Sequence, residues 1–196
     1  MRLRRVIPPF LAIIFPLLSL GQDAKEEQFK TALNDIVTKI INKDSAGLAR
    51  YIDKNTGIYL LYRIGVQDTY SHYPTIGFKD STYPRILFSL SRVTKIQPVK
   101  YGRLPEFSKG KWNKKGAYAD TKLTDQLLTK TALSMKRNEI CEISQAELGE
   151  MTAVQAKSRR VVIIENDSRY LCLYLMYVNN KWVLTIFDAL TGDESV

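Results

Sequence analysis

The C-terminal third of the chain restricts the possible folds more than any other part of the sequence. Three apolar runs rich in β-branched and aromatic residues are separated by two short turn sequences, at 166–168 and 179–180. Runs of this length bounded by turn formers predict β-strands. The pair Asn179-Asn180 suits a two-residue type I′ turn, because asparagine tolerates the positive φ angles of that turn. The sequence therefore predicts a three-strand antiparallel meander over residues 159–165, 169–178 and 181–188.

The Asn179-Asn180 turn also predicts which residues of the last hairpin face one another. Counting outward from the turn gives one row of cross-strand pairs: Tyr177/Trp182, Leu175/Leu184, Leu173/Ile186 and Leu171/Asp188. Because side chains alternate between the two faces of a sheet, this row is apolar except at its end and is expected to face the core. The other face of the hairpin is mixed, and we expect it to lie under a loop or at a dimer interface.

Apolar residues upstream of the meander recur at helical spacing. Between residues 23 and 42 they fall on one face, which predicts an amphipathic helix. A second, short helix is expected within 44–53, where Asp44 or Ser45 can cap the first turn. A third helix is expected over 121–138, because its leucines form one stripe.

The remaining segments predict strands and irregular structure. The apolar run 58–65 is expected to form a buried strand, and 86–102 is expected to hold one or two more. Residues 66–85 are rich in turn formers and tyrosine, and 104–120 are basic, so both segments are expected to be irregular. Helices that precede a strand-rich half indicate an α+β fold.

The first 21 residues have the organisation of a secretory signal peptide. Three arginines precede an apolar segment over 6–20, which ends in small residues suited to cleavage between Gly21 and Gln22. The apolar segment is broken by prolines and is shorter than the roughly 20 residues that a membrane-spanning helix needs. We therefore expect an exported chain, periplasmic or extracellular, with one α+β domain over 22–196 and no transmembrane segment.

Net charge and the scarcity of metal ligands restrict the partners of the mature chain. The 29 basic and 20 acidic residues give a formal charge of +9, which the loss of three arginines and no acids lowers to +6. This charge favours anionic partners, and for an exported protein we expect glycan or lipid phosphate rather than nucleic acid. One histidine and two distant cysteines do not supply a zinc ligand set. No metal and no cofactor are therefore expected.

Two alternatives remain open for Cys141 and Cys172, the only cysteines of the chain. In an oxidising compartment a disulfide between them would close a loop with 30 intervening residues. In the chain-entropy model such a loop contributes about 3–4 kcal/mol. The alternative is a pair of buried thiols, since Cys172 lies inside an expected apolar strand.

The order of these segments resembles the NTF2-like (SnoaL-like) superfamily. The resemblance rests on two N-terminal helices leading into "GIYLLYRIG", and on a closing meander that ends in "NNKWVLTIF" and "DALTG". It covers about residues 25–190. It implies a cone, in which a curved, mostly antiparallel sheet wraps around the N-terminal helices and leaves a cavity at its open end. The superfamily includes enzymes and binding modules, so the resemblance does not assign a function.

Asp188 and His72 are the two candidate catalytic residues. Asp188 ends the apolar row of the last hairpin, where a cavity would desolvate its carboxylate, raise its pKa and make it a usable base. The alternative is that Asp188 caps the "DALTG" turn through backbone N–H groups. His72 lies near Asp68 and two tyrosines, and could act as a base oriented by a carboxylate. The alternative is that His72 is a surface or packing residue.

Two groups of side chains are candidates for binding. Amphipathic aromatic rings suit the wall of a cavity or a partner-binding surface, and the ligand-binding candidates are Tyr59, Tyr62, Tyr70, Tyr73 and Trp182. Their alternative role is at the periphery of the core. A second group mixes positive charge with an indole, as surfaces that hold anionic polymers do, and consists of Lys109, Lys111, Trp112, Lys114 and Lys115. Its alternative is a solvated loop with Trp112 tucked into the fold.

These features support three hypotheses about function. The first is a non-catalytic exported domain that binds a small ligand, an envelope component or another protein, including a second copy through the sheet face. The second is an NTF2-like enzyme, an isomerase, cyclase or hydrolase, that uses Asp188 or His72. The third is a surface protein that binds anionic glycan or lipid through the segment 109–115.

Overall fold

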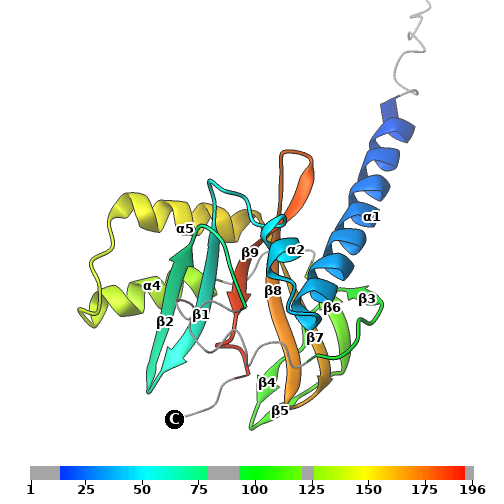
Figure 1. Ribbon diagram of the computed structural model, residues 1–196. Helices are drawn as coiled ribbons and strands as arrows, with labels where there is room; N and C mark the ends of the chain where they lie inside the picture. Colours follow the sequence, from blue (N-terminus) through cyan, green and yellow to red (C-terminus); the bar gives the residue numbers. More distant parts are fainter. Residues whose placement is uncertain (1–13, 79–92, 121–125, 193–196) are drawn as a thin grey trace, which may run out of the picture.

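The computed structural model describes residues 14–78, 93–120 and 126–192, and these residues form an α+β fold (Figure 1). The helices are α1 (Ile14–Ile41), α2 (Ser45–Ala49), α4 (Leu127–Arg137) and α5 (Gln145–Lys157). The strands are β1 (Ile58–Ile64), β2 (Gln67–Tyr73), β3 (Val99–Tyr101), β4 (Phe107–Ser108), β5 (Lys111–Trp112), β6 (Gly116–Ala119), β7 (Ser158–Asn166), β8 (Arg169–Val178) and β9 (Lys181–Asp188). The α+β class expected from the sequence is confirmed.

One open sheet organises the fold. Its strands lie in the order β2-β1-β9-β8-β7-β6-β3, and β4 pairs with β5 in a separate small hairpin. Neighbouring strands of the large sheet are antiparallel, except that β1 is parallel to β9 and β3 is parallel to β6. Strand β9 therefore lies inside the sheet, next to β1.

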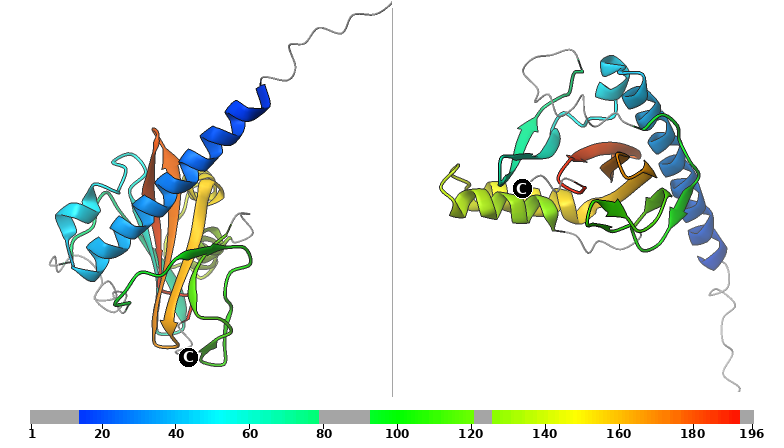
Figure 2. Two further views of the ribbon diagram at one scale, coloured as in Figure 1. Left: turned by 90° about the vertical axis from the view of Figure 1, so that its right-hand side faces the viewer. Right: turned by 90° about the horizontal axis from the view of Figure 1, so that it is seen from below.

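Helix α1 covers one face of the sheet and makes the main core with it (Figure 2). Its fully buried side chains recur at helical spacing, as the sequence predicts, and are Phe29, Leu33, Ile36, Val37 and Ile40. They pack against alternate residues of the central strands, among them Leu171, Leu173 and Leu175 of β8. We call this side of the sheet the α1 face.

Helices α4 and α5 and the β4–β5 hairpin cover the opposite face, which we call the α5 face. Tyr59 of β1 and Tyr174 of β8 pack there against Leu128 and Met151 of the two helices. Beneath the small hairpin, Trp112 packs against Val162, Ile164 and Cys172. The mixed face of the last hairpin is thus covered by other parts of the same chain.

The C-terminal meander is confirmed, with one correction to its register. Asn179 and Asn180 have φ angles of 48° and 61°, as a type I′ turn requires. The pairs nearest the turn, Tyr177/Trp182 and Leu175/Leu184, are as expected, but Tyr174 then pairs with Ile186. The extra residue is Thr185, whose hydroxyl lies 2.8 Å from that of Ser158 and donates to the carbonyl of Tyr174 at 3.1 Å.

The bulge at Thr185 reverses the faces of the last three residues of β9. Phe187 pairs with Leu173 and lies in the α1-face core, whereas Ile186 lies on the α5 face. Asp188 pairs with Cys172 rather than with Leu171. The expectation that Asp188 continues the core-facing row is therefore wrong, because one extra residue in a strand inverts the alternation that follows it.

Three other expectations are corrected by the described residues. Residues 67–73, expected to be irregular, form the edge strand β2. Because most of its residues are polar, the sequence lacks the alternation of apolar and polar residues that predicts a strand. The basic stretch 104–120 contains the β4–β5 hairpin and β6. Helix α5 was not expected, because its buried side chains are few, but the capping box of Ser144 and Glu147 marks its first turn. Residues 79–92 and 121–125 lie outside the described ranges; of these, 79–85 were expected to be irregular, 86–92 to belong to a strand and 121–125 to a helix.

Helix α1 begins earlier than the amphipathic pattern predicts. It starts at Ile14 and continues through the expected cleavage point after Gly21. Its first turns extend beyond the sheet, and only its later turns lie against it (Figures 1 and 2). In the described part of the chain, no helix combines the length and the apolar character needed to cross a membrane.

Candidate functional site

A hollow of about 400 Å³ lies between α1, the end of α2 and the turn of the β8–β9 hairpin. We call it the α1–hairpin hollow. Its walls come from Gln28 and Thr31 of α1, Arg50 and Tyr51 after α2, and Lys181 and Trp182 of β9. Its size is within the range of small-molecule sites in proteins, about 300–1,000 Å³.

Trp182 is held rigidly at this site. Its indole is 5% exposed and meets the ring of Phe29 edge-on, with centroids 4.9 Å apart. The indole Nε1 donates to the carbonyl of Lys25 at 3.2 Å. Because the indole packs against Phe29 of α1 and its N–H is hydrogen-bonded to the carbonyl of Lys25 in the same helix, it is a fixed part of the wall. Of the five aromatic residues expected to bind a ligand, Trp182 is the one that lines this hollow.

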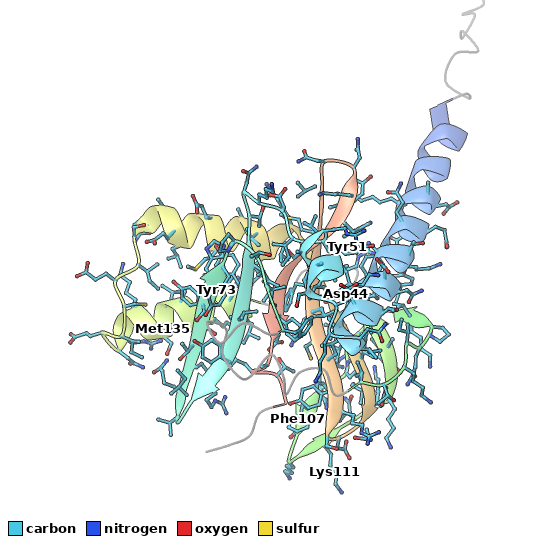
Figure 3. All side chains as sticks on the ribbon, viewed as in Figure 1. Asp44, Tyr51, Tyr73, Phe107, Lys111 and Met135 are labelled. Atoms are coloured by element: carbon cyan, nitrogen blue, oxygen red, sulfur yellow. The ribbon has the colours of Figure 1, made fainter. Side chains whose placement is uncertain are left out.

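Tyr51 is the second aromatic residue of the hollow (Figure 3), and its hydroxyl group is already hydrogen-bonded within the protein. It donates to Asp35 Oδ2 at 2.8 Å, and the Tyr51 carbonyl accepts the backbone N–H of Leu184 at 2.7 Å. Burial and the hydrogen bond to Asp35 raise the pKa of Tyr51 to about 12. The side chain is therefore neutral at physiological pH and ties the end of α2 to both α1 and β9.

The α1 wall is anchored to the sheet by an ion pair. Both guanidinium nitrogens of Arg159 on β7 donate to the carboxylate of Glu26, at 2.8 and 2.7 Å. The guanidinium also lies over the rings of Phe29 and Trp182, 4.4 and 5.1 Å from their centroids. The hydrogen bonds from Arg159 lower the pKa of Glu26 below its ordinary value of 4.5. Charge and ring packing together fix this part of α1 beside Trp182.

Asp188, the first candidate base, is buried on the α5 face and away from this hollow. Its Oδ1 accepts the backbone N–H groups of Leu190 and Thr191 at 3.0 and 2.9 Å. Its Oδ2 accepts the hydroxyl of Thr191 and a guanidinium nitrogen of Arg160, both at 2.8 Å. The carboxylate thus caps the turn after β9, which is the alternative considered for it, and it also neutralises Arg160. Arg160 was not identified from the sequence, although a basic residue at the start of an apolar strand is a signal for such a partner.

His72, the second candidate base, is an exposed residue of the edge strand β2. Its Nε2 lies 2.8 Å from the carbonyl of Thr56, and its ring stacks on Tyr59, with centroids 4.2 Å apart. The carboxylate of Asp68, expected to orient it, instead accepts a hydrogen bond from Arg63 at 2.8 Å. His72 therefore has the packing role that was its alternative.

The tyrosines expected to bind a ligand are divided between the two faces of the sheet. Tyr59 and Tyr70 contact the α4–α5 layer, where burial raises the pKa of Tyr59 to about 12 and raises that of Tyr70. Tyr62 and Tyr73 pack against the α1-face core. The structure does not bring these four side chains together in one cavity.

The basic segment lies around the β4–β5 hairpin, at the opposite end of the sheet from Tyr51 (Figure 3). Lys109, Lys111 and Lys115 are exposed, and Lys114 donates to the carbonyl of Arg103 at 3.2 Å. Trp112 is 6% exposed and packs against Val162, Ile164 and Cys172. This indole therefore packs within the fold, which is the alternative considered for this segment.

The two cysteines are not joined in a disulfide. Cys172 is buried beneath the β4–β5 hairpin, whereas Cys141 is half-buried in the loop between α4 and α5. The structure thus has the second of the two alternatives, thiols within the fold. No group of three histidine, cysteine or acidic side chains within the described ranges could hold a metal ion.

Comparisons with known proteins do not identify relatives. No protein-family model matches the chain, and no curated protein and no solved structure is detectably similar to it. The arguments about function that follow therefore rest on the geometry of this chain.

Proposed function

We propose that this protein is an exported, non-catalytic binding domain that holds a small ligand in the α1–hairpin hollow. The observation that carries the proposal is the hollow itself, a space of about 400 Å³ bordered by two anchored aromatic side chains. Rigid aromatic walls with a few polar groups are typical of ligand sites. The ligand would lie mainly against Tyr51, which is half-buried, because Trp182 is 5% exposed.

The residues around the hollow favour binding over catalysis. Glu27 is the acidic side chain of its wall, and it forms an ion pair with Lys30. Asp188 lies on the other face of the sheet, and His72 belongs to the edge strand. A general acid or base must reach the reacting atom within hydrogen-bond distance, and neither candidate lies in the wall of the hollow.

We also propose that the fold is a variant of the NTF2-like cone and that residues 1–21 are removed on export. Support for the cone comes from the position of α1 along one face of an open, mostly antiparallel sheet (Figure 2). Support for export comes from the first turns of α1, which extend beyond the sheet, so that their loss leaves the Glu26–Arg159 anchor in place. Expression of the full chain in a host that exports it, followed by N-terminal sequencing, should give Gln22 as the first residue. An intact N-terminus in the secreted fraction would contradict this.

The binding proposal is tested by filling the hollow. Thr31 is exposed and lines it, so Thr31→Trp should block entry without touching the core. The matched control is Asn34→Trp, an exposed position of α1 that does not line the hollow. Two dyes of the same shape, 8-anilinonaphthalene-1-sulfonate and neutral N-phenyl-1-naphthylamine, serve as probes. At least one dye should bind the wild-type chain and Asn34→Trp with the same affinity. The affinity of that dye for Thr31→Trp should be lower by about tenfold or more. If neither dye shows binding that Thr31→Trp weakens, the proposal is wrong.

A further inference from the structure

We infer that the ligand of the α1–hairpin hollow is a small organic anion with a flat apolar body, such as an aromatic carboxylate or sulfonate. The inference rests on the proposed function and adds the chemical class of the ligand. It depends on two cations at the rim of the hollow, on the acids around them and on the aromatic wall.

The rim carries two cations that approach the hollow from different elements. Arg50 directly follows α2, and Lys181 directly follows the turn of the β8–β9 hairpin. Both side chains are exposed, and among the described residues neither forms an ion pair. The acid of the wall, Glu27, is neutralised by Lys30. The rim therefore has an excess of positive charge.

The acids nearest to these cations are committed to backbone groups. Asp44 caps α2 by accepting the N–H of Gly47 at 2.8 Å, and Asp53 accepts the N–H groups of Asn55 and Thr56 at 3.1 and 3.0 Å. These hydrogen bonds lower the pKa of each carboxyl. Each acid is therefore charged at neutral pH. Asp53 Oδ1 accepts from its own turn, and the second oxygen of Asp44 lies 3.6 Å from Lys39 Nζ. An added anion would supply the direct partner that Arg50 and Lys181 lack.

The aromatic side chains that line the hollow favour an apolar, planar body. Trp182 and Tyr51 are fixed by contacts with Lys25 and Asp35, so neither gives up a hydrogen bond when a ring lies against it. The volume of about 400 Å³ accommodates a ligand of one or two rings. Gln28 of α1 and Asn180 of the hairpin turn add neutral amide donors at the edge. An anionic group beside Arg50 and Lys181, with the ring inside, satisfies both parts of the site.

The test compares the two dyes, which share a ring system but differ in charge. The sulfonate dye should bind the wild-type chain about tenfold more tightly than the neutral dye, and 0.5 M NaCl should weaken only the sulfonate. The variant Arg50→Gln/Lys181→Gln should lose about tenfold in affinity for the sulfonate and nothing for the neutral dye. The control Lys130→Gln/Lys157→Gln removes two exposed charges elsewhere and should bind both dyes as the wild type does.

The outcomes separate this inference from the proposal on which it depends. In one outcome, Thr31→Trp blocks both dyes, the wild-type chain binds both with equal affinity, and Arg50→Gln/Lys181→Gln weakens neither dye more than the other. The hollow then binds ligands, but the proposed anionic class of ligand is wrong. If Thr31→Trp affects neither dye, both proposals are wrong. Circular dichroism of each variant confirms that the dyes report on folded protein.

Discussion

Glu26 of α1 and Arg159 of β7 form a two-fold hydrogen-bonded ion pair, with nitrogen–oxygen distances of 2.7 and 2.8 Å. The pair joins residues separated by 133 positions in the chain. It lies where the guanidinium also covers Phe29 and Trp182. The contact fixes α1 against the sheet beside the α1–hairpin hollow.

Glu26→Gln should destabilise the protein by about 1–3 kcal/mol, because it leaves a largely buried guanidinium without its charge partner. The measurement is urea denaturation monitored by circular dichroism. The matched control is Glu27→Gln, one residue away, whose exposed pair with Lys30 should contribute less than about 1 kcal/mol. Equal losses for the two variants would show that the Glu26–Arg159 pair has no special role.

The same pair predicts a dependence of stability on acid. The folded state holds the pKa of Glu26 below 4.5 because Arg159 donates to its carboxylate. The stabilisation is therefore present above about pH 4.5, and it is lost as the pH falls through the folded-state pKa. Denaturation between pH 3 and pH 6 should show a smaller difference between the wild type and Glu26→Gln at the acidic end. A difference that grows on acidification would contradict this.

Asp188→Asn should cost about 3–5 kcal/mol, because Asp188 is fully buried and the change removes the ion pair between its carboxylate and Arg160. The exposed pair of Arg103 and Glu106 offers the control, and Glu106→Gln should cost less than about 1 kcal/mol. Thermal denaturation compares the two. Dye binding by the fraction of Asp188→Asn that remains folded should equal that of the wild type, since Asp188 does not line the hollow. If Asp188→Asn has normal stability but has lost dye binding, Asp188 has a role in binding rather than in stability.

Asn179 has a φ of 48° at the turn of the last hairpin. Asn179→Ala should destabilise the protein by about 1 kcal/mol, because alanine tolerates this region poorly. Asn179→Gly should be as stable as the wild type or more so, since glycine adopts positive φ without steric cost. Paired denaturation curves measure both changes. If alanine and glycine have the same effect, the turn conformation does not limit stability.

Burial raises the pKa of Tyr59 to about 12, so its hydroxyl stays protonated in the folded protein when an unfolded tyrosine, with a pKa of 10.0, would ionise. The stabilisation from the neutral group is present below about pH 10 and is lost as the pH rises toward 12. Stability should therefore decline over this interval, and Tyr59→Phe should decline less steeply. Absorbance at 295 nm follows the ionisation. Full ionisation near pH 10 without unfolding would show that Tyr59 is accessible to solvent.

Local signals in the sequence predict much of the fold but little of the candidate site. The type I′ turn, the Asp44 cap of α2 and the helical spacing of Phe29, Leu33 and Ile36 each depend on neighbouring residues, and each is confirmed. The face of Asp188 is not predictable in this way. It depends on a bulge stabilised by a hydroxyl contact between Thr185 and Ser158, which belong to different strands.

The hollow cannot be predicted from the sequence, because its residues are distant from one another along the chain. Trp182 was identified as an aromatic candidate, but its neighbours Arg50 and Tyr51 lie about 130 positions earlier and carry no motif. Tyr59 and Tyr62 looked equivalent as candidates, although the alternation of β1 places them on opposite faces of the sheet. Topology, rather than composition, decides which rings share a cavity.

The bulge at Thr185 divides β9 into two parts that can vary independently. Residues 181–184 keep the register set by the Asn179-Asn180 turn, and Lys181 and Trp182 among them line the hollow. Residues 186–188 keep the register set by pairing with β1, and Asp188 among them is the partner of Arg160. A shift of one residue in the turn can be absorbed at Thr185 before it reaches Asp188. The wall of the hollow can therefore diversify in evolution while the buried ion pair that closes the fold is preserved.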